Sequence, residues 1–415
     1  MHHPPLQPIR VGMISMTDLD DPNPISGMPY RMARALEGHG VEIVPVPAWA
    51  LGPEQGSVGR RASNRIVQIH HRRTPMWIRR AHDNLRPGAT RAKVFRRVTR
   101  LSGLAQSNLD ALIESGVQLD ALFGCCISSA MYALKTDLPM VYFSDATSKI
   151  IQKTYPTLAL RGDAFREALY EVEKVSVAKT WAAVFAAPST QRSAIDDLGI
   201  EPEKTSVVAM GAHVVPSVDE VIESPASCPT RSSCRILIVA ADPIRKRVDL
   251  ATRATEILCE RGIDAKLCVI GKGTKVSRGS HAVESVGVLR LSDPEDRKRH
   301  QKLLRECHIQ FLPSLGEAFG IAPCESAHYA RPSIVAGAGG LSFVIRDGQT
   351  GIVLDVDADA KAWADAAESL IDDPERYRAM SIAGLERARD ELNWDAWGAS
   401  LRRILDEQIQ IHRQR

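Results

Sequence analysis

The sequence predicts an α/β protein made of two Rossmann-like, doubly wound domains that face a central cleft. The chain has 415 residues, whereas a single hydrophobic core stops growing at about 250 to 300 residues. Its 44% hydrophobic and 25% charged residues are typical of a globular chain. Short apolar runs alternate with longer segments of helical period, which is the pattern of parallel sheets flanked by helices.

The first domain is expected over residues 1–215. An amphipathic helix follows Ser26-Gly27 and should turn Met32 and Leu36 inward. Further helical periods cover residues 164–177 and 189–198. The strands are expected at residues 9–15, 41–46, 119–123, 139–143, 182–187 and 206–209.

Residues 216–233 are rich in Pro, Ser and Glu and predict a linker. A second α/β series then begins, so the second domain is expected over residues 234–392. Residues 393–415 are expected to form a helix that crosses back to the first domain. The second domain should contain strands at 235–239, 266–270, 309–312, 333–336 and 352–354, and helices near 247–261, 294–307 and 360–371.

The composition disfavours several classes of protein. The longest apolar runs, such as 236–241, have the length of strands, so no transmembrane helix is expected. No apolar stretch of signal-peptide length precedes residue 9, which favours a cytoplasmic location. The eight cysteines form no CxxC pair and no Cys/His cluster at zinc spacing, which supports neither a disulfide scaffold nor a structural zinc site. No cofactor is expected. Gly271-Lys-Gly273 lacks the third glycine of a dinucleotide fingerprint, which disfavours a nicotinamide dehydrogenase.

The net charge of +3 conceals a basic segment at residues 60–100. This segment holds thirteen Lys or Arg residues and one acid, Asp83, which leaves 40 basic and 49 acidic residues elsewhere. Apolar residues such as Trp77 interleave with its arginines, as in a surface that meets anionic lipid headgroups. A solvated helical face, a nucleic-acid surface and contacts to an anionic acceptor are the alternatives. The residues predicted to form the membrane or acceptor surface are Arg72, Arg73, Trp77, Arg79, Arg80, Arg96 and Arg97.

Two carboxylates, Glu317 and Glu325, follow the expected strand that ends at Leu312. Residues eight apart on one helix differ by about 80° of rotation and about 12 Å of rise, so the two groups could not meet on one small ligand. Gly316 and Gly320 instead favour a loop around Glu317 that leads into a helix bearing Glu325. A helix start at the carboxyl edge of a parallel sheet binds phosphate, and flanking carboxylates accept hydrogen bonds from sugar hydroxyls.

These residues belong to a longer ordered pattern. Between the two carboxylates lies Phe319-Gly320, and Gly339-Gly340-Leu341 and Asp347-Gly348-x-Thr350-Gly351 follow them. The pattern resembles the signature of the retaining glycosyltransferases of family 4, also called group 1, which have the GT-B architecture. Gly27 before the first helix, Lys246 before a later helix and Asn393-Trp394 before the last helix occur in the order that the resemblance implies.

The resemblance implies roles for particular residues. Glu317 would contact the hydroxyls of the donor sugar, Glu325 the ribose, and Lys246 the diphosphate, where negative charge grows in the transition state. The implied catalytic residues are Glu317, Lys246 and Asp145. The implied donor-binding residues are Gly27, Arg245, Lys246, Glu317, Phe319, Gly320, Ile321, Glu325, Gly339 and Gly340.

The sequence departs from the family pattern at three positions. Relatives have an arginine five residues before the lysine, where this chain has Ala241, so Arg245 or Arg247 must replace it. Asp145 lies near the position of a donor-contacting histidine in relatives, and a helix N-cap is the alternative reading of this residue. His213 stands where Asn or Asp is commoner.

The expected function is therefore hexosyl transfer from a nucleoside diphosphate sugar, UDP- or GDP-linked, to an acceptor hydroxyl, with retention and without metal. The basic segment favours a lipid-linked or polysaccharide acceptor of the cell envelope and a peripheral position on the inner face of the membrane. A soluble tailoring glycosyltransferase that acts on a small metabolite, and a nucleic-acid-binding or DNA-modifying protein, are the alternatives.

Overall fold

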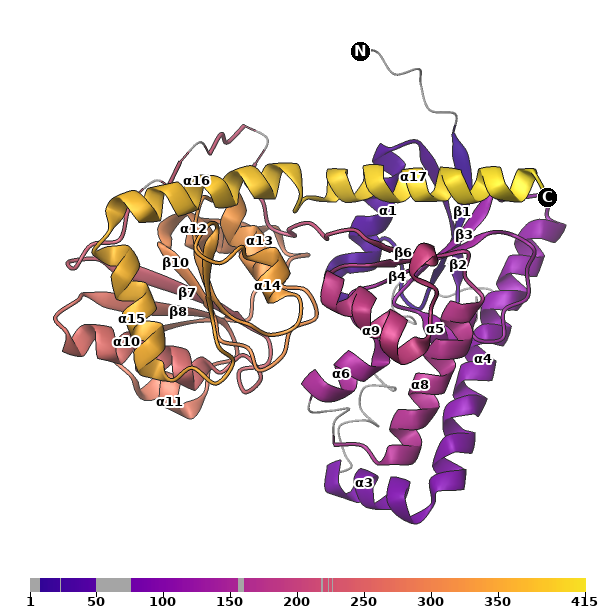
Figure 1. The fold of residues 1–415 in the computed structure, drawn as a ribbon, viewed down its shortest axis with the longest axis horizontal. Helices are drawn as coiled ribbons and strands as arrows, with labels where there is room; N and C mark the ends of the chain where they lie inside the picture. The colour runs from indigo at the N-terminus through magenta and orange to yellow at the C-terminus, as the bar shows by residue number, and fades with distance from the viewer. Residues whose placement is uncertain are drawn as a thin grey trace.

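The computed structural model describes residues 8–22, 24–49, 76–155, 160–217, 219–222, 224–225 and 227–415. Two α/β domains lie side by side (Figure 1). Helices α16 (Pro374–Asp390) and α17 (Trp394–Arg413) run along one edge of the molecule, from the second domain to the first.

The first sheet is fully parallel, with the strand order β2-β1-β3-β4-β5-β6. Its strands are β1 (Ile9–Ser15), β2 (Val41–Pro47), β3 (Ala121–Cys125), β4 (Met140–Ser144), β5 (Ala182–Phe185) and β6 (Thr205–Val207). The third strand begins two residues later than the sequence predicts, because its register pairs Val11 with Ala121. The strand order reverses at β1, and such a switch point marks where ligands bind outside the carboxyl ends of the strands.

The second sheet is also parallel, with the order β12-β11-β10-β7-β8-β9. Its strands are β7 (Cys234–Ala240), β8 (Ala265–Gly271), β9 (Val283–Gly287), β10 (Ile309–Leu312), β11 (Ser333–Ala336) and β12 (Gly351–Leu354). The edge strand β9 was not predicted, because Glu284 and Ser285 are exposed and interrupt its apolar pattern. The switch point lies between β7 and β10, so the loops that carry Lys246 and Glu317 emerge side by side.

Helices cover both faces of the sheets, which confirms the expected α/β class. The first domain contains the short helices η1 (Pro24–Gly27) and η2 (Pro202–Lys204), and α1 (Met28–Gly38), α3 (Met76–Leu85), α4 (Pro87–Glu114), α5 (Ser128–Met131), α6 (Ser148–Thr154), α8 (Asp163–Ala178) and α9 (Pro188–Leu198). The second contains α10 (Val248–Glu260), α11 (Lys275–Gly279), α12 (Pro294–Glu306), α13 (Ile321–His328), α14 (Leu341–Val344) and α15 (Ala360–Ile371).

Most of the basic segment that the structure describes lies on α3 and α4, which form the lower end of the first domain in Figure 1. Arg80, Arg96 and Arg97 are exposed on these helices, whereas Arg79 is half-buried. Arg72 and Arg73 lie outside the described residues, as does the side chain of Trp77. Among the helices of the described residues, none combines the length and the apolarity needed to cross a membrane.

Helix α17 packs on the first domain, where it contacts α1 and β3. Trp397 is fully buried, and its ring lies edge-on to Phe123 and Phe143 at centroid distances of 6.1 and 5.6 Å. Arg402 donates hydrogen bonds to the backbone carbonyls of His39 and Gly40, each 2.9 Å long. The end of the chain is therefore part of the core of the first domain.

Replacing Trp397 with alanine is expected to destabilise the first domain by about 3 to 5 kcal/mol, because it removes a large buried side chain and leaves a cavity. Urea unfolding followed by circular dichroism measures the change. Glu407→Ala, at an exposed position of the same helix, is the control and should change stability by less than about 0.5 kcal/mol. Equal stability of the two variants would contradict this packing role.

Candidate active site

A buried cluster of charged side chains lies at the switch point of the second sheet. Glu317 follows β10, and its carboxylate accepts a hydrogen bond from Lys246 Nζ at the start of the α10 region. Arg245 Nη1 lies 3.4 Å from the same Oε2 atom and donates a 2.7 Å hydrogen bond to the carbonyl of Gly316. Ser314 Oγ donates to the carboxylate at 3.2 Å. All three charged residues are less than 10% exposed.

The cluster keeps its members charged. Burial alone would raise the pKa of Glu317, but Lys246 and Arg245 outweigh it and lower the pKa below its usual value. Burial lowers the pKa of Lys246, and Glu317 counteracts this effect. The carboxylate and the cations therefore stabilise each other in a place where neither would be stable alone.

The backbone of the Glu317 loop rests directly on two glycines. A Cβ atom on Gly339 would lie 1.8 Å from the carbonyl oxygen of Glu317, and one on Gly340 would lie 2.6 Å from that of Ala318. Only glycine permits this close approach. Both residues thus hold the loop in place by packing, and direct contact with a donor remains a prediction for them.

The loop leads into α13 through Gly320, which has a φ of +118° and precedes the first helical residue, Ile321. The free N–H groups of this helix start therefore lie in the same loop as Glu317. Phe319 is fully buried and packs against Phe343. Only its backbone is thus available to a ligand.

The first domain reaches the cluster through the end of α6. The Arg245 guanidinium carbon lies 4.8 Å from the ring centroid of Tyr155, which is a cation–π contact between the two domains. A Cβ atom on Gly316 would lie 2.4 Å from Cβ of Thr154. Tyr155, which the sequence analysis did not single out, therefore covers the charged cluster from the opposite side.

Asp145 follows β4 on the first-domain side. Cys126 Sγ, at the end of β3, lies 3.6 Å from its Oδ1 atom. Burial raises the pKa of Asp145 to about 6, and the negative charge of Glu317 contributes. The N-cap of α6 is Thr147, whose side chain accepts from the N–H of Ile150, so the alternative reading of Asp145 as the helix N-cap is wrong.

The structure also distinguishes the two candidates for the missing arginine. The guanidinium of Arg247 donates to the carbonyl of Val356, away from Glu317. Arg245 instead contacts both Glu317 and Tyr155. Arg245 is therefore the arginine that accompanies Lys246.

Glu325 lies one helical turn beyond the start of α13 and is 4% exposed. Its Oε1 atom accepts a 3.1 Å hydrogen bond from the backbone N–H of Val214, in the segment that leaves the first domain. Its Oε2 atom is 3.8 Å from His300 Nε2. Burial raises the pKa of Glu325 to about 8, although the nearby Val214 N–H, Arg31 and Arg297 act in the opposite direction.

A pocket of about 310 Å³ lies between the domains beside Glu325. The first domain and its exit segment contribute Pro22, Tyr30, Arg31 and His213, and the second domain contributes Leu291, Ser292, Pro294 and Arg297. Gly27 adjoins this pocket with a φ of +77°, and a Cβ atom there would lie 2.7 Å from the carbonyl oxygen of Pro22. The sequence analysis missed Arg31 and Arg297, which belong to no recognisable motif.

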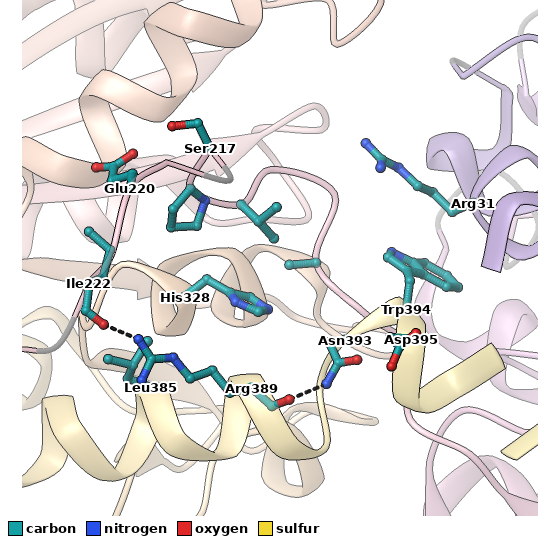
Figure 2. A pocket seen from close by; sticks show the side chains of 13 residues that line it. Arg31, Ser217, Glu220, Ile222, His328, Leu385, Arg389, Asn393, Trp394 and Asp395 are labelled. Atoms are coloured by element: carbon teal, nitrogen blue, oxygen red, sulfur yellow. Dashed lines mark hydrogen bonds between the residues drawn. The ribbon is translucent and has the colours of Figure 1, made fainter. Parts of the chain in front are cut away.

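A second cavity, of about 400 Å³, lies where the chain crosses between the domains (Figure 2). Trp394 and Asn393 at the start of α17 face Ser217 and Ile222 of the linker across it, and Arg31 reaches its rim. Arg389, near the end of α16, donates to the carbonyl of Ile222. This hydrogen bond joins the linker to the segment that leads from α16 into α17. Among the described residues, no three His, Cys, Asp or Glu side chains form a group that could hold a metal ion.

Comparison with known proteins shows what the residues of this site are similar to. Residues 232–387 match the family described as glycosyl transferases group 1. D-inositol 3-phosphate glycosyltransferase of Corynebacterium glutamicum is 29% identical over 224 residues, which cover 50% of this chain and 53% of that protein. The chain therefore spans about half the length of this curated relative.

Two solved structures share the arrangement of both domains. Sucrose-phosphate synthase of Thermosynechococcus elongatus has a TM-score of 0.65 at 15% identity, and the match covers 97% of this chain and 100% of that one. Anabaena HepE, solved in complex with UDP and glucose, has a TM-score of 0.58 at 12% identity and covers 96% and 99%. We conclude that the second half of this chain is similar to the glycosyl transferases group 1 family and that the two domains together have the GT-B fold.

Proposed function

We propose that the protein is a retaining glycosyltransferase that moves a sugar from a nucleoside diphosphate to an acceptor hydroxyl. The observation that carries the proposal is the buried cluster of Lys246, Arg245 and Glu317 beside the start of α13. Two cations and free backbone N–H groups suit a diphosphate, and a carboxylate suits sugar hydroxyls. The match to the group 1 family over residues 232–387 supports the same activity.

The ion pairs suggest how the donor is received. Lys246 and Arg245 share Glu317 as their anion. A bound diphosphate supplies a new anionic partner for both cations, and the carboxylate then becomes free to accept hydrogen bonds from the sugar. This exchange of partners avoids leaving any buried charge uncompensated.

Sugar transfer needs stabilisation of the departing diphosphate, because negative charge develops there as the glycosidic bond breaks. Lys246, Arg245 and the N–H groups of α13 supply it, with no step that requires a metal. The departing phosphate oxygen takes the proton of the acceptor hydroxyl on the same face of the sugar, so the anomeric configuration is retained. Asp145 faces the reacting sugar from the first domain, and Tyr155 covers Arg245.

The acceptor is proposed to be a membrane-associated glycolipid or polysaccharide intermediate, bound by the first domain. Leu85, the last residue of α3, is 80% exposed, and Arg80 and Arg86 near it are exposed as well. Arg96 and Arg97 add exposed positive charge on α4. An apolar tip surrounded by cations suits the interface of an anionic membrane.

Glu317→Gln is expected to lower sugar transfer by about a hundredfold or more, because the uncharged amide is a weaker acceptor for the sugar hydroxyls. Nucleoside diphosphate affinity should stay the same or increase, since Lys246 and Arg245 lose a competing anion. Initial rates and calorimetric titration with the nucleotide measure the two effects. The control is Glu306→Gln, at an exposed position of α12, and a wild-type rate in Glu317→Gln would contradict the assigned role.

Nucleotide binding is expected to release protons near pH 7. The pKa of Glu325 in the free protein is raised to about 8, so its carboxyl group is mostly protonated at that pH. Hydrogen bonds from ribose hydroxyls favour the carboxylate and lower this pKa. Titration calorimetry in buffers of different ionisation enthalpy should detect the release in the wild type and its loss in Glu325→Gln. A wild type that releases no proton would argue against ribose binding at Glu325.

Reversing the charges of Arg96 and Arg97 to glutamate should abolish binding to vesicles that contain phosphatidylglycerol. The wild type should bind them at low salt and dissociate at high salt, since the attraction is electrostatic. The matched control reverses Arg376 and Arg378, two exposed arginines of α16. Cosedimentation measures binding, and equal binding of both double variants would count against the membrane role. Full turnover of a soluble acceptor without lipid would instead favour a tailoring enzyme.

A further inference from the structure

The interdomain pocket beside Glu325 contains two arginines that the proposed mechanism does not use. Arg31 comes from α1 of the first domain, and Arg297 comes from α12 of the second. The positive charge of Arg297 contributes to lowering the pKa of Arg31, after burial, so the two guanidiniums influence each other. The pocket is thus lined by one positive charge from each domain.

Neither arginine has an acidic partner within hydrogen-bonding distance among the described residues. Arg31 donates a 2.9 Å hydrogen bond to the backbone carbonyl of His213, which leaves most of its N–H groups free. Glu325 is the nearby acid, but it is engaged with Val214. Both guanidinium groups line the pocket, so their unused N–H groups are available to a ligand that supplies acceptor atoms.

Two neutral rings complete the pocket. His213 is 3% exposed, and its Nε2 atom has no hydrogen-bond partner. Burial, helped by Arg31, lowers its pKa to about 3, so the ring is uncharged. The half-buried ring of Tyr30 offers an aromatic surface. A flat ligand with polar edges fits such surroundings.

The position of the pocket indicates which part of a nucleotide it meets. The charged cluster lies by the start of α13, and Glu325 lies about one turn, roughly 5 to 6 Å, further along the helix. Arg31 donates to the carbonyl of His213, and the next residue, Val214, donates to Glu325, so the pocket lined by Arg31, His213 and Arg297 lies beside Glu325. A nucleotide with its diphosphate at Lys246 and its ribose at Glu325 would therefore extend its base into the pocket.

We propose that Arg31 and Arg297 select a donor whose nucleobase presents carbonyl acceptors, uracil or guanine, over one that carries adenine. This inference rests on the proposed function. Guanidinium groups have donors only and match the carbonyl and ring-nitrogen acceptors of guanine or the carbonyls of uracil. Adenine has only ring-nitrogen acceptors, and its amino donor stands where guanine has the O6 carbonyl, so an arginine can make one hydrogen bond to that edge of adenine but two to that of guanine.

Titration calorimetry with UDP, GDP, ADP and inorganic pyrophosphate tests the proposal. The wild type should bind UDP or GDP at least about tenfold more tightly than ADP, and comparison of UDP with GDP identifies the base. Arg297→Met should lower the affinity for the preferred nucleotide about tenfold or more and reduce the ratio of that affinity to the affinity for ADP. The affinity for pyrophosphate should stay within about twofold of the wild-type value. Arg31→Met should act in the same direction. The control Arg299→Met, at an exposed position of α12, should change nothing.

The remaining outcomes overturn the inference in distinguishable ways. An unchanged preference in Arg297→Met and Arg31→Met, with intact nucleotide binding, rejects base selection and leaves the proposed function standing. An equal loss of pyrophosphate affinity would make the arginines a phosphate clamp instead. Absence of binding to every nucleotide by the wild type would reject both this inference and the proposed function.

Discussion

The arrangement of the candidate active site depends on the buried ion pair between Lys246 and Glu317. Lys246 and Glu317 lie on loops from neighbouring strands of the second sheet, and each is nearly inaccessible to water. Desolvation of both ions is costly, and removing either partner of such a pair typically costs about 3 to 5 kcal/mol. The pair therefore holds two loops together. If Glu317 moves away, Lys246 needs another anion to compensate its buried charge. In the function proposed above, a diphosphate is the anion that takes the place of Glu317 when Glu317 binds the sugar.

The surrounding backbone serves to hold this pair in position. Gly339 and Gly340 press against the Glu317 loop so closely that a side chain on either residue would collide with it. Arg245 adds a second cation and receives the ring of Tyr155 from the other domain. The charged cluster of the second domain is thus in direct contact with the first domain.

The segment that connects the two domains also contacts the candidate active site, at Glu325. Glu325 accepts a hydrogen bond from the Val214 backbone, in the segment that leaves the first sheet, and His213 and Arg31 lie next to it. A ligand that binds Glu325 therefore acts on the segment that joins the domains. Helix α17 returns to the first domain and buries Trp397 there, so both crossings are anchored in packed structure.

The sequence alone determined the class of fold, and it singled out Lys246 and Glu317, which the structure brings together. Buried parallel strands appear as continuous apolar runs, and the spacing of Lys246, Glu317 and Glu325 is local enough to carry a recognisable pattern. It did not reveal β9, whose exposed Glu284 and Ser285 hide the strand, or α4, whose long surface is mostly polar. Only the tertiary structure decided that Arg245 and not Arg247 joins the cluster, that Tyr155 covers it, and that Arg31 faces Arg297. The reason is physical: these contacts join residues 70 or more positions apart, and such pairings are set by how the two sheets and their loops pack.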